Sequence, residues 1–233
     1  MNVPISPLAY TGTDILEAMA EAKRYNKFLV SLITCRLNES DSVVDFGAGI
    51  GTFAVAIQES CANLVCVEPD VKQISIMTSN NLNVVSDIAR IESETIDFLY
   101  SLNVFEHIED DQAALKEVAR VLKPNGVALI YVPARNILFS AMDKKVGHYR
   151  RYSKKSLKIL VKSANFEITR LEYVDCIGFF AALGYKVFGN SNGDLSVEAV
   201  KFYDHYLFPI SRLLDKITHP AIGKNLILEL RRM

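Results

Sequence analysis

The stretch VVDFGAGIGTF, residues 43–53, restricts the fold of this chain more than any other segment. An apolar run, SVVDF (42–46), ends in three glycines at positions 47, 49 and 51, and a helical pattern, TFAVAIQES, follows at once. A buried strand, a glycine-rich turn and a helix in this order are typical of the first unit of a nucleotide-binding α/β sheet. Glycine also lets a ligand approach the backbone closely. The segment therefore predicts a ligand-binding loop at the carboxyl end of a first strand.

Short apolar runs alternate with helical patterns along the rest of the chain, which indicates an α/β protein. Helices are predicted at about 14–38, where Asp14 and Glu17 resemble a capping box, at 71–80, and at 110–122, where KPNG stops the helix. The predicted strands after the first are 63–70, 83–87, 96–104, 127–134, 166–174 and 225–231. Right-handed crossovers between parallel strands give a doubly wound sheet that binds ligands at its carboxyl edge.

Length, charge and cysteine usage exclude several classes of protein. A chain of 233 residues, half of them apolar, can bury one core, so we expect a single domain over residues 1–233. The formal net charge of −1 disfavours a globally basic nucleic-acid binder. The four cysteines show no CxxC spacing, which gives no support to a zinc site or a disulfide framework. The sequence shows no targeting segment or membrane span, so we expect a cytoplasmic protein, monomeric or homodimeric, without a nucleic-acid partner.

The glycine loop also indicates what kind of ligand binds. The dinucleotide fingerprint is GxGxxG, but Thr52 stands where its third glycine should be. Asp45 would repel a pyrophosphate and attract a ligand that carries positive charge. S-adenosylmethionine has an ammonium, a sulfonium and a ribose, and Glu68 at the end of the second strand suits the ribose hydroxyls. Asp87, after the third strand, suits the amino group of an adenine.

With these motifs in place, the chain resembles the class I S-adenosylmethionine-dependent methyltransferases, of the type 11/12-like kind. The resemblance rests on VVDFGAGIGTF, VCVEPD, VVSDI, LYSLNVFEHIEDD and VLKPNG taken together. It implies a Rossmann-like, seven-stranded, mainly parallel sheet whose last strand is antiparallel. It also implies that S-adenosylmethionine is bound by the residues that match the motifs: Asp45, Gly47, Ala48, Gly49, Gly51, Glu68, Pro69, Asp87, Ile88 and Asn103.

The expected organisation is an N-terminal helical segment (1–40), a cofactor-binding core (41–174), a helical lid or substrate insertion (175–222) and the last strand (223–233). About 50 residues separate the last two strands, far more than a hairpin needs. Their main helix is predicted at 197–217 despite Pro209. RYNKFL, GHYRRYSKKSL and the C-terminal tail resemble a bacterial methyltransferase subgroup that often accompanies polysaccharide or secondary-metabolite genes, and whose acceptors are poorly defined.

Methyl transfer to a hydroxyl or an ammonium requires a base, and His107 and His148 are the candidates for it. The alternative for His107 is a structural role at the start of the next helix. Glu106 and His107 also resemble part of an ExxEH pattern that holds magnesium in some small-RNA and quinone-precursor methyltransferases. Asn103 replaces the first acid of that pattern, so no metal is expected.

The segment 143–158, DKKVGHYRRYSKKSLK, holds eight basic or histidine residues and one acid. Ser153 as a helix N-cap accounts for its second half. Tyr149, Arg150, Arg151 and Tyr152 form a candidate substrate site in which an arginine clamps an anionic acceptor between aromatic walls. The alternative for the two arginines is ion pairing that stabilises the fold.

The predicted function is methyl transfer to an O or N atom of a small acceptor, anionic or related to glycosyl or secondary-metabolite compounds. Two alternatives remain open. A catalytically silent S-adenosylmethionine-binding regulatory protein would keep the cofactor residues but lack turnover. An NAD-dependent oxidoreductase would share the strand, the glycine loop and the acid about 20 residues further on, but it would need the GxGxxG spacing.

Overall fold

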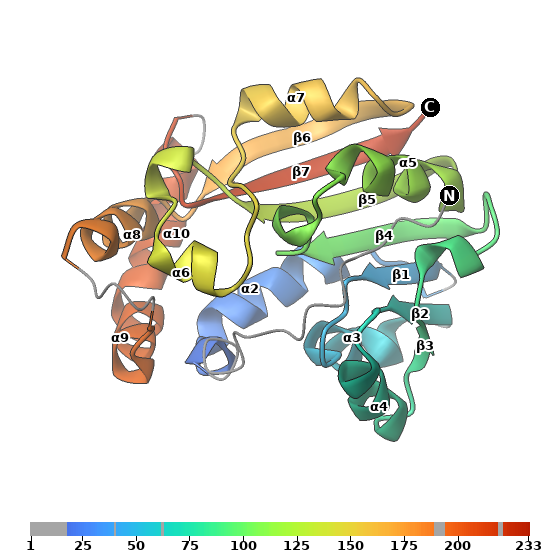
Figure 1. Cartoon of the computed structure of the whole chain (residues 1–233), viewed down its shortest axis with the longest axis horizontal. Coiled ribbons are helices and arrows are strands. Elements are labelled where there is room, and N and C mark those ends of the chain that lie inside the picture. The colour runs from blue at the N-terminus through green and yellow to red at the C-terminus, as the bar shows by residue number, and fades with distance from the viewer. Residues whose placement is uncertain (1–17, 40, 62, 189–193, 219–220) are drawn as a thin grey trace.

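The computed structural model describes residues 18–39, 41–61, 63–188, 194–218 and 221–233. In this part of the chain, seven strands form one sheet with helices on both of its faces (Figure 1). The strands are β1 (Ser42–Phe46), β2 (Asn63–Val67), β3 (Asn83–Val85), β4 (Ile96–Leu102), β5 (Leu122–Pro133), β6 (Phe166–Val174) and β7 (Asn225–Arg232). The helices are α2 (Lys23–Thr34), α3 (Thr52–Ile57), α4 (Val71–Ser79), α5 (Asp111–Val121), α6 (Ala141–Lys145), α7 (Lys154–Val161), α8 (Cys176–Phe188), α9 (Val197–Phe202) and α10 (Phe208–Thr218).

The order of the strands is β3-β2-β1-β4-β5-β7-β6. Neighbouring strands are parallel except for β7, which lies antiparallel between β5 and β6. The predicted doubly wound, mainly parallel sheet with an antiparallel last strand is therefore confirmed. The order reverses next to β1, so the carboxyl ends of β1 and β4 lie at the switch point where such sheets bind ligands.

Two apolar layers hold the sheet between its helices. On one face, α5 and α7 pack on the central strands, and on the other face α2 and α3 do so (Figure 1). The buried side chains of α5 are Ala114, Leu115, Val118 and Val121, which lie on one side of this helix. The strands in the middle are nearly continuously buried, as parallel strands covered on both faces must be.

The N-terminal helix differs from the prediction. Residues 18–20 are helical, the chain turns at Glu21 and Ala22, and α2 begins anew at Lys23. The Asp204 carboxylate, 180 residues away, accepts the backbone N–H groups of Arg24 (2.9 Å) and Tyr25 (2.8 Å). These N–H groups belong to the first turn of α2, where backbone N–H groups have no carbonyl partner within the helix. A single helix over 14–38 is therefore wrong, and the predicted capping box at Asp14 lies outside the described residues.

The KPNG segment also differs from the prediction. The preceding helix ends at Val121 and β5 begins at once, so KPNG lies within the strand rather than in a turn before it. The six residues of β5 from Leu122 to Val127 lie opposite the three residues of β4 from Ile96 to Phe98, and Asn125 adopts a left-handed conformation with φ 66°. This pattern is a bulge, which absorbs the proline and the glycine inside a strand. The strands β3 and β4 also end two residues earlier than predicted.

The insertion between β6 and β7 is helical, as expected. It contains α8 and a continuous helical rod formed by α9, a π-helical turn (Tyr203–Leu207) and α10. In a regular helix the Pro209 ring would clash with the carbonyl of residue 205, but the wider π turn ends just before it and lets the rod continue. The role of this insertion as a lid stays a prediction.

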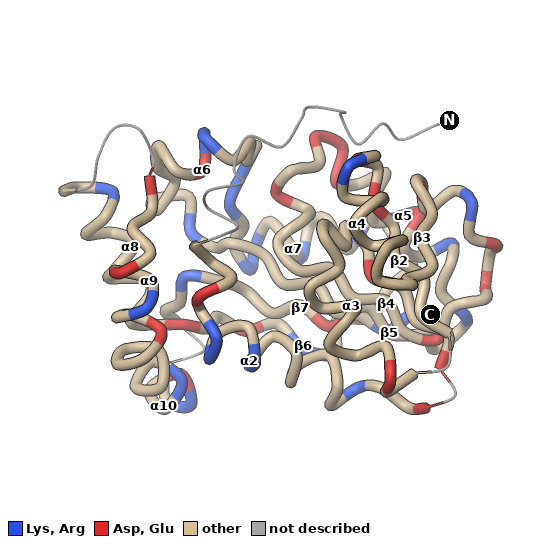
Figure 2. Tube along the Cα trace, turned by 90° about the horizontal axis from the view of Figure 1, so that it is seen from below, with Lys and Arg blue, Asp and Glu red and all other residues tan. Residues whose placement is uncertain are grey.

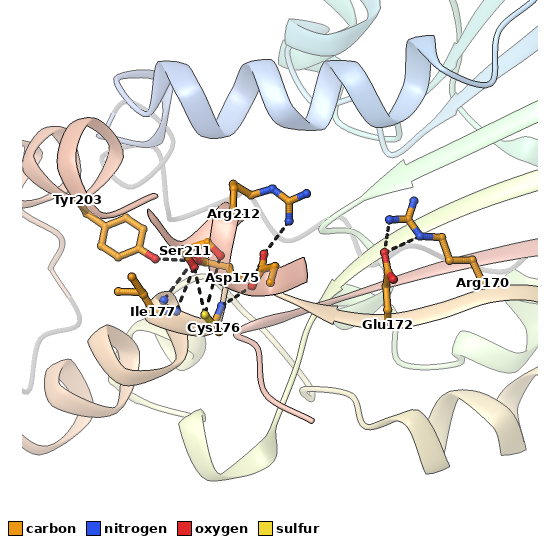
Figure 3. A network of polar contacts seen from close by, with 10 residues as sticks. Arg170, Glu172, Asp175, Cys176, Ile177, Tyr203, Ser211 and Arg212 are labelled. Atoms are coloured by element: carbon orange, nitrogen blue, oxygen red, sulfur yellow. Dashed lines mark hydrogen bonds and ion pairs between the residues drawn. The ribbon is translucent and has the colours of Figure 1, made fainter. Parts of the chain in front are cut away.

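A buried polar network fastens the insertion to the end of β6 (Figure 3). Asp175, at φ 66°, accepts hydrogen bonds from the hydroxyls of Tyr203 and Ser211. Asp215 accepts the backbone N–H groups of Asp175 (2.8 Å) and Cys176 (2.9 Å). Figure 3 shows Ser211 from α10 and Tyr203 from the π turn pointing toward Asp175 at the start of α8. The network fixes the direction in which α8 and α10 leave the sheet.

Lys, Arg, Asp and Glu occur in both halves of the tube in Figure 2, in keeping with a net charge of −1. Among the residues that the structure describes, no helix combines the length and the apolar character needed to cross a membrane.

Candidate active site

The glycine loop leaves β1 in a conformation that two of its glycines require. Gly47 and Gly51 have φ of 81° and 82°, a region that side chains disfavour. A Cβ at Gly47 would lie 2.4 Å from the Val104 side chain, and one at Gly51 would lie 2.7 Å from Leu82 and 2.8 Å from Met77. The N–H of Gly47 donates to the Val67 carbonyl (2.9 Å), which ties the loop to the end of β2. Larger residues at these two positions would therefore disturb both the turn and the packing below it.

Glu68 connects the loop to β2. One carboxylate oxygen accepts the Gly49 N–H (2.9 Å), and the other accepts the Asp70 N–H (3.0 Å). Burial raises the pKa of Glu68, while these two backbone hydrogen bonds oppose the rise. Each carboxylate oxygen has a second lone pair, so ribose hydroxyls can still donate to Glu68. Pro69 follows directly, and Asp70 then caps α4 by accepting the N–H of Lys72 (2.8 Å).

Asp45 is a buried acid at the end of β1, only 3% exposed. Among the described residues, its Oδ2 atom has no hydrogen-bond partner. Burial raises the pKa of Asp45 to about 7. The nearby Tyr100 hydroxyl acts to lower this pKa, and the charge of Glu68 acts to raise it further. A buried carboxylate without a full set of partners is costly unless a ligand completes it. Asp45 therefore fits a ligand with a positive group, as the sequence predicts.

The other predicted cofactor residues lie along the same edge of the sheet. Ala48 is buried inside the loop. Asp87 follows β3 and accepts the Ala89 N–H (2.9 Å), which caps a short helical turn over Ile88–Arg90, and Ile88 is buried in the core. Asn103 follows β4 at φ 56° and donates its N–H to the Tyr131 carbonyl (2.8 Å). These positions suit a ligand laid across the ends of β1, β2, β3 and β4, and their contacts with it stay predictions.

The two predicted catalytic histidines come together beyond β4 and β5. The rings of His107 and His148 have their centroids 4.6 Å apart in an edge-to-face arrangement. Burial, and then the charge of His148, lowers the pKa of His107 to about 4, so this imidazole is neutral at pH 7. The His107 ring also hydrogen-bonds the backbone at Val146 and Gly147. His107 thus joins the turn after β4 to the segment after α6, which is a wider role than capping a helix.

Glu106 completes this cluster. It is fully buried, and neither of its carboxylate oxygens has a hydrogen-bond partner among the described residues. Burial raises the pKa of Glu106 to about 8. Its Oε1 lies 3.8 Å from His148 Nε2, longer than a hydrogen bond. The ligand atoms of Glu106, His107 and His148 lie within 4.8 Å of one another, so these three are the described residues that could hold a metal ion. The expectation that this protein uses no metal stays a prediction.

Asp143 is the functional candidate that sequence reasoning missed. Its Oδ1 atom lies 2.7 Å from His148 Nδ1, and its two oxygens accept the Arg151 guanidinium at 2.8 and 3.0 Å. Burial would raise the pKa of Asp143, but the hydrogen bond from His148 and the charge of Arg151 lower it to about 2. The available signal was that Asp143 is the one acid in the basic segment 143–158.

The predicted substrate residues divide into two groups. Arg151 is buried against Asp143, and the buried Tyr152 hydroxyl donates to Asp111 (2.8 Å) and also lies 3.1 Å from the Phe105 carbonyl oxygen. Arg150 pairs with Asp111 (2.9 Å) but keeps 30% of its side chain exposed, and Tyr149 is 46% exposed. The contacts of Arg151 are those of the fold-stabilising alternative. The expected Ser153 cap of α7 is present, with its hydroxyl accepting the Ser156 N–H (3.0 Å).

The comparison with protein families decides the identity of this domain. The model of a family described as a methyltransferase domain matches residues 15–171. The chain belongs to this methyltransferase family. A probable S-adenosylmethionine-dependent methyltransferase of Mycolicibacterium smegmatis is 24% identical to it over 210 residues, which cover 85% of this chain and 79% of the relative.

Solved structures of methyltransferases share the fold. A Thermotoga maritima enzyme described as an S-adenosylmethionine-dependent methyltransferase, possible histamine N-methyltransferase, superposes with a TM-score of 0.64 at 17% identity over 95% of both chains. Phosphoethanolamine N-methyltransferase 2 of Haemonchus contortus, in complex with S-adenosylmethionine, superposes with a TM-score of 0.60 at 13% identity. That match covers 89% of this chain and 52% of the other. The prediction of S-adenosylmethionine as the cofactor of this methyltransferase is confirmed.

Proposed function

We propose that this methyltransferase moves the methyl group of S-adenosylmethionine to an oxygen or nitrogen atom of a small acceptor. The observation that carries the proposal is the cluster of Glu106, His107 and His148, which follows β4 and β5 at the same sheet edge as the glycine loop. Carbon acceptors with no proton to remove would not need such a cluster. Anionic compounds and glycosyl or secondary-metabolite compounds are the first acceptor classes to test.

S-adenosylmethionine supplies an electrophilic methyl group bound to a positive sulfur. In our proposal the glycine loop lies under this cofactor, Asp45 orients its methionine end, and Glu68 accepts hydrogen bonds from its ribose. Asp87 and Ile88 flank the adenine, and the remaining predicted contacts are Ala48, Pro69 and Asn103. The unpartnered oxygen of Asp45 and the glycine conformations support these assignments.

His107 and His148 act on the acceptor in this proposal. The acceptor must lose a proton as its oxygen or nitrogen bonds to the methyl carbon, and a neutral imidazole takes that proton well near pH 7. The low pKa of His107 keeps this ring neutral but makes it a weak base. His148 is therefore the better candidate for the base, and His107 lines the wall beside it.

Acceptor binding is assigned to Tyr149 and Arg150, with Arg151 and Tyr152 behind them. The exposed ring of Tyr149 and the partly exposed guanidinium of Arg150 are available to an acceptor, and Arg150 can bind an anionic group while it remains near Asp111. The two proteins with a similar fold are described as a possible histamine N-methyltransferase and a phosphoethanolamine N-methyltransferase, which adds amines to the acceptors worth testing. The likeness of GHYRRY to a bacterial subgroup names no acceptor by itself.

The test is a turnover assay that detects S-adenosylhomocysteine while panels of anionic, glycosyl and amine acceptors are screened. The active acceptor is then used with His148→Asn and with His205→Asn as a matched control, because His205 lies in the π turn of the insertion rather than in the cluster. We expect His148→Asn to abolish turnover with cofactor binding intact, and His205→Asn to keep it. Cofactor binding without turnover on any panel would favour the silent regulatory protein.

The two alternatives are less well supported. A silent binding protein has no use for a buried acid next to two imidazoles at the cofactor edge. In an NAD-dependent oxidoreductase, the glycine loop would lie beside the pyrophosphate of NAD. The negative charge of the buried Asp45 would then repel the pyrophosphate. Titration with NAD, S-adenosylmethionine and S-adenosylhomocysteine separates these cases, and tight binding of NAD alone would contradict our proposal.

A further inference from the structure

The His148 ring is held by an acid that the predicted catalytic set did not include. Its Nδ1 atom lies 2.7 Å from Asp143 Oδ1, and its backbone N–H donates to the Asp143 carbonyl at 2.8 Å. Side chain and main chain of His148 are thus both tied to the same residue. Its Nε2 atom points the other way and lies 3.8 Å from the fully buried Glu106.

Asp143 is itself held rigidly. One oxygen, Oδ1, accepts Arg151 Nε (2.8 Å), and the other, Oδ2, accepts the terminal guanidinium nitrogen (3.0 Å). Oδ2 also accepts the N–H (2.9 Å) and the hydroxyl (3.2 Å) of Ser140. Asp143 is fully buried and Arg151 nearly so, so solvent does not compete for these bonds. The carboxylate therefore has one orientation, with Oδ1 toward the imidazole.

This arrangement selects one form of the imidazole. A neutral histidine carries its proton on either Nδ1 or Nε2, and the partner of one nitrogen decides which. An ionised carboxylate can only accept, so Nδ1 must carry the proton and Nε2 must keep its lone pair. The lone pair is then on the nitrogen that faces the cluster with Glu106 and His107.

We propose that Asp143 is a positioning residue, fixed by Arg151, which holds His148 in the form whose Nε2 accepts the proton of the methyl acceptor. This inference rests on the proposed function for its catalytic consequence. Arg151 then acts through Asp143 rather than by touching an anionic acceptor. The acidic group also stabilises the imidazolium that forms when Nε2 takes the proton.

The acceptor oxygen or nitrogen forms a bond to the methyl carbon while the carbon–sulfur bond breaks, and that electron pair stays on sulfur in S-adenosylhomocysteine. The acceptor's proton passes to His148 Nε2, and the imidazolium releases it to solvent afterwards. Among the residues that the structure describes, the titratable side chains that face the His148 ring are Asp143 from α6, and Glu106 and His107 from the turn after β4.

The decisive variant is Asp143→Asn, because the amide cannot serve all of these donors. Three donors converge on Oδ2, two from Ser140 and one from Arg151, so the single amide oxygen must take that position. The amide nitrogen then faces His148 Nδ1 and donates to it. The imidazole proton moves to Nε2, and the base is blocked. The amide nitrogen also faces Arg151 Nε, whose hydrogen bond to Oδ1 is lost in this variant.

The measurement is nitrogen NMR of protein labelled in its four histidines, with His148 assigned by the signal lost in His148→Asn. We expect the wild type to carry the proton on Nδ1 of His148 and Asp143→Asn to carry it on Nε2. With an active acceptor, kcat should fall on the order of 10²- to 10⁴-fold while the cofactor Kd is unchanged. The acid limb of the pH–rate profile should disappear with the base.

Asp97→Asn is the matched control. Asp97 also accepts a backbone N–H, from Ser42 (3.0 Å), and pairs with a cation, Lys123 (2.8 Å), but at the opposite end of β4. It should change thermal stability alone. If Asp143→Asn does not fold, Arg151→Lys serves instead. Lysine keeps the positive charge but cannot donate the two parallel hydrogen bonds of the guanidinium. We therefore expect a smaller loss of kcat, with the imidazole proton still on Nδ1 of His148.

A wild-type proton on Nε2 would overturn the proposal without any variant. So would an Asp143→Asn protein that shifts the melting temperature as Asp97→Asn does but keeps kcat and the pH profile. If no acceptor is turned over, the proposed function fails, yet the NMR result still decides whether Asp143 fixes the imidazole.

Discussion

Cofactor binding by this methyltransferase should be coupled to the ionisation of Asp45. In the free protein, burial raises the pKa of this carboxyl to about 7, although the Tyr100 hydroxyl acts to lower it. The ammonium and sulfonium of S-adenosylmethionine favour the ionised carboxylate. Binding should therefore strengthen as the pH rises through 7, and below that pH it should release a proton.

The magnitude follows from the raised pKa. With a pKa of about 7, Asp45 is about one tenth ionised at pH 6 and about nine tenths ionised at pH 8. If the bound state holds only the ionised form, the cofactor Kd should fall about tenfold between these two pH values, or ~1.4 kcal/mol. About half a proton should be released per cofactor at pH 7.

Titration calorimetry at pH 6, 7 and 8, in buffers with different ionisation enthalpies, measures both the Kd and the proton count. Asp45→Asn is the matched control, because the amide has the same shape and cannot ionise. S-adenosylhomocysteine lacks the sulfonium charge, so its Kd should depend less steeply on pH. Glu68 and Glu106 also have raised pKa values, and the difference between wild type and Asp45→Asn removes their contribution.

Equal pH dependence in the wild type and in Asp45→Asn would refute this reasoning. It would mean that Asp45 stays protonated beneath the bound cofactor, or that it is already ionised in the free protein. Proton uptake in place of release would exclude the proposed contact between Asp45 and the positive end of the cofactor.

Three further predictions concern stability and metal dependence. Gly51→Ala should lower the free energy of unfolding in urea by about 1–3 kcal/mol, because its φ is 82° and its Cβ would meet Leu82. Gly184→Ala, whose Cβ meets nothing within 4 Å, should be neutral or stabilising. Asp204→Ala should cost about 1 kcal/mol by thermal unfolding, since it removes the acceptor for two N–H groups of α2. Dialysis against EDTA should leave activity unchanged, because the pKa of Glu106, about 8, makes a proton compete with any cation; stimulation by Mn²⁺ or Mg²⁺ would contradict this.

The parts of this fold that the sequence predicts are those set by local patterns. Strand β6 was predicted with both of its bounds, because a run of alternating apolar residues between polar turns leaves little choice. The candidate cofactor residues Asp45, Glu68 and Asp87 were predicted from their places within two residues of the carboxyl ends of β1, β2 and β3. Parallel strands bring their carboxyl ends to one edge, so residues far apart in sequence share a site by topology alone.

The parts that the sequence did not predict depend on contacts between distant segments. The start of α2 is capped by Asp204, 180 residues away, which no local capping pattern can reveal. The KPNG segment reads as a turn, yet pairing with β4 draws it into a bulged strand. The partners of Arg150 and Arg151 depend in the same way on how the loop after β5 folds back on β4.

That difference yields a last prediction for the two arginines, which adjoin in sequence but differ in burial. Arg151→Ala leaves Asp143 as a buried charge without its main partner, so it should cost about 3–5 kcal/mol of stability. Arg150→Ala removes a partly exposed pair with Asp111 and should cost about 0–1 kcal/mol. If Arg150 binds an anionic acceptor, its removal should raise the acceptor KM and leave the cofactor Kd unchanged. An unchanged KM in Arg150→Ala, with equal destabilisation in both variants, would mean that both arginines serve the fold alone.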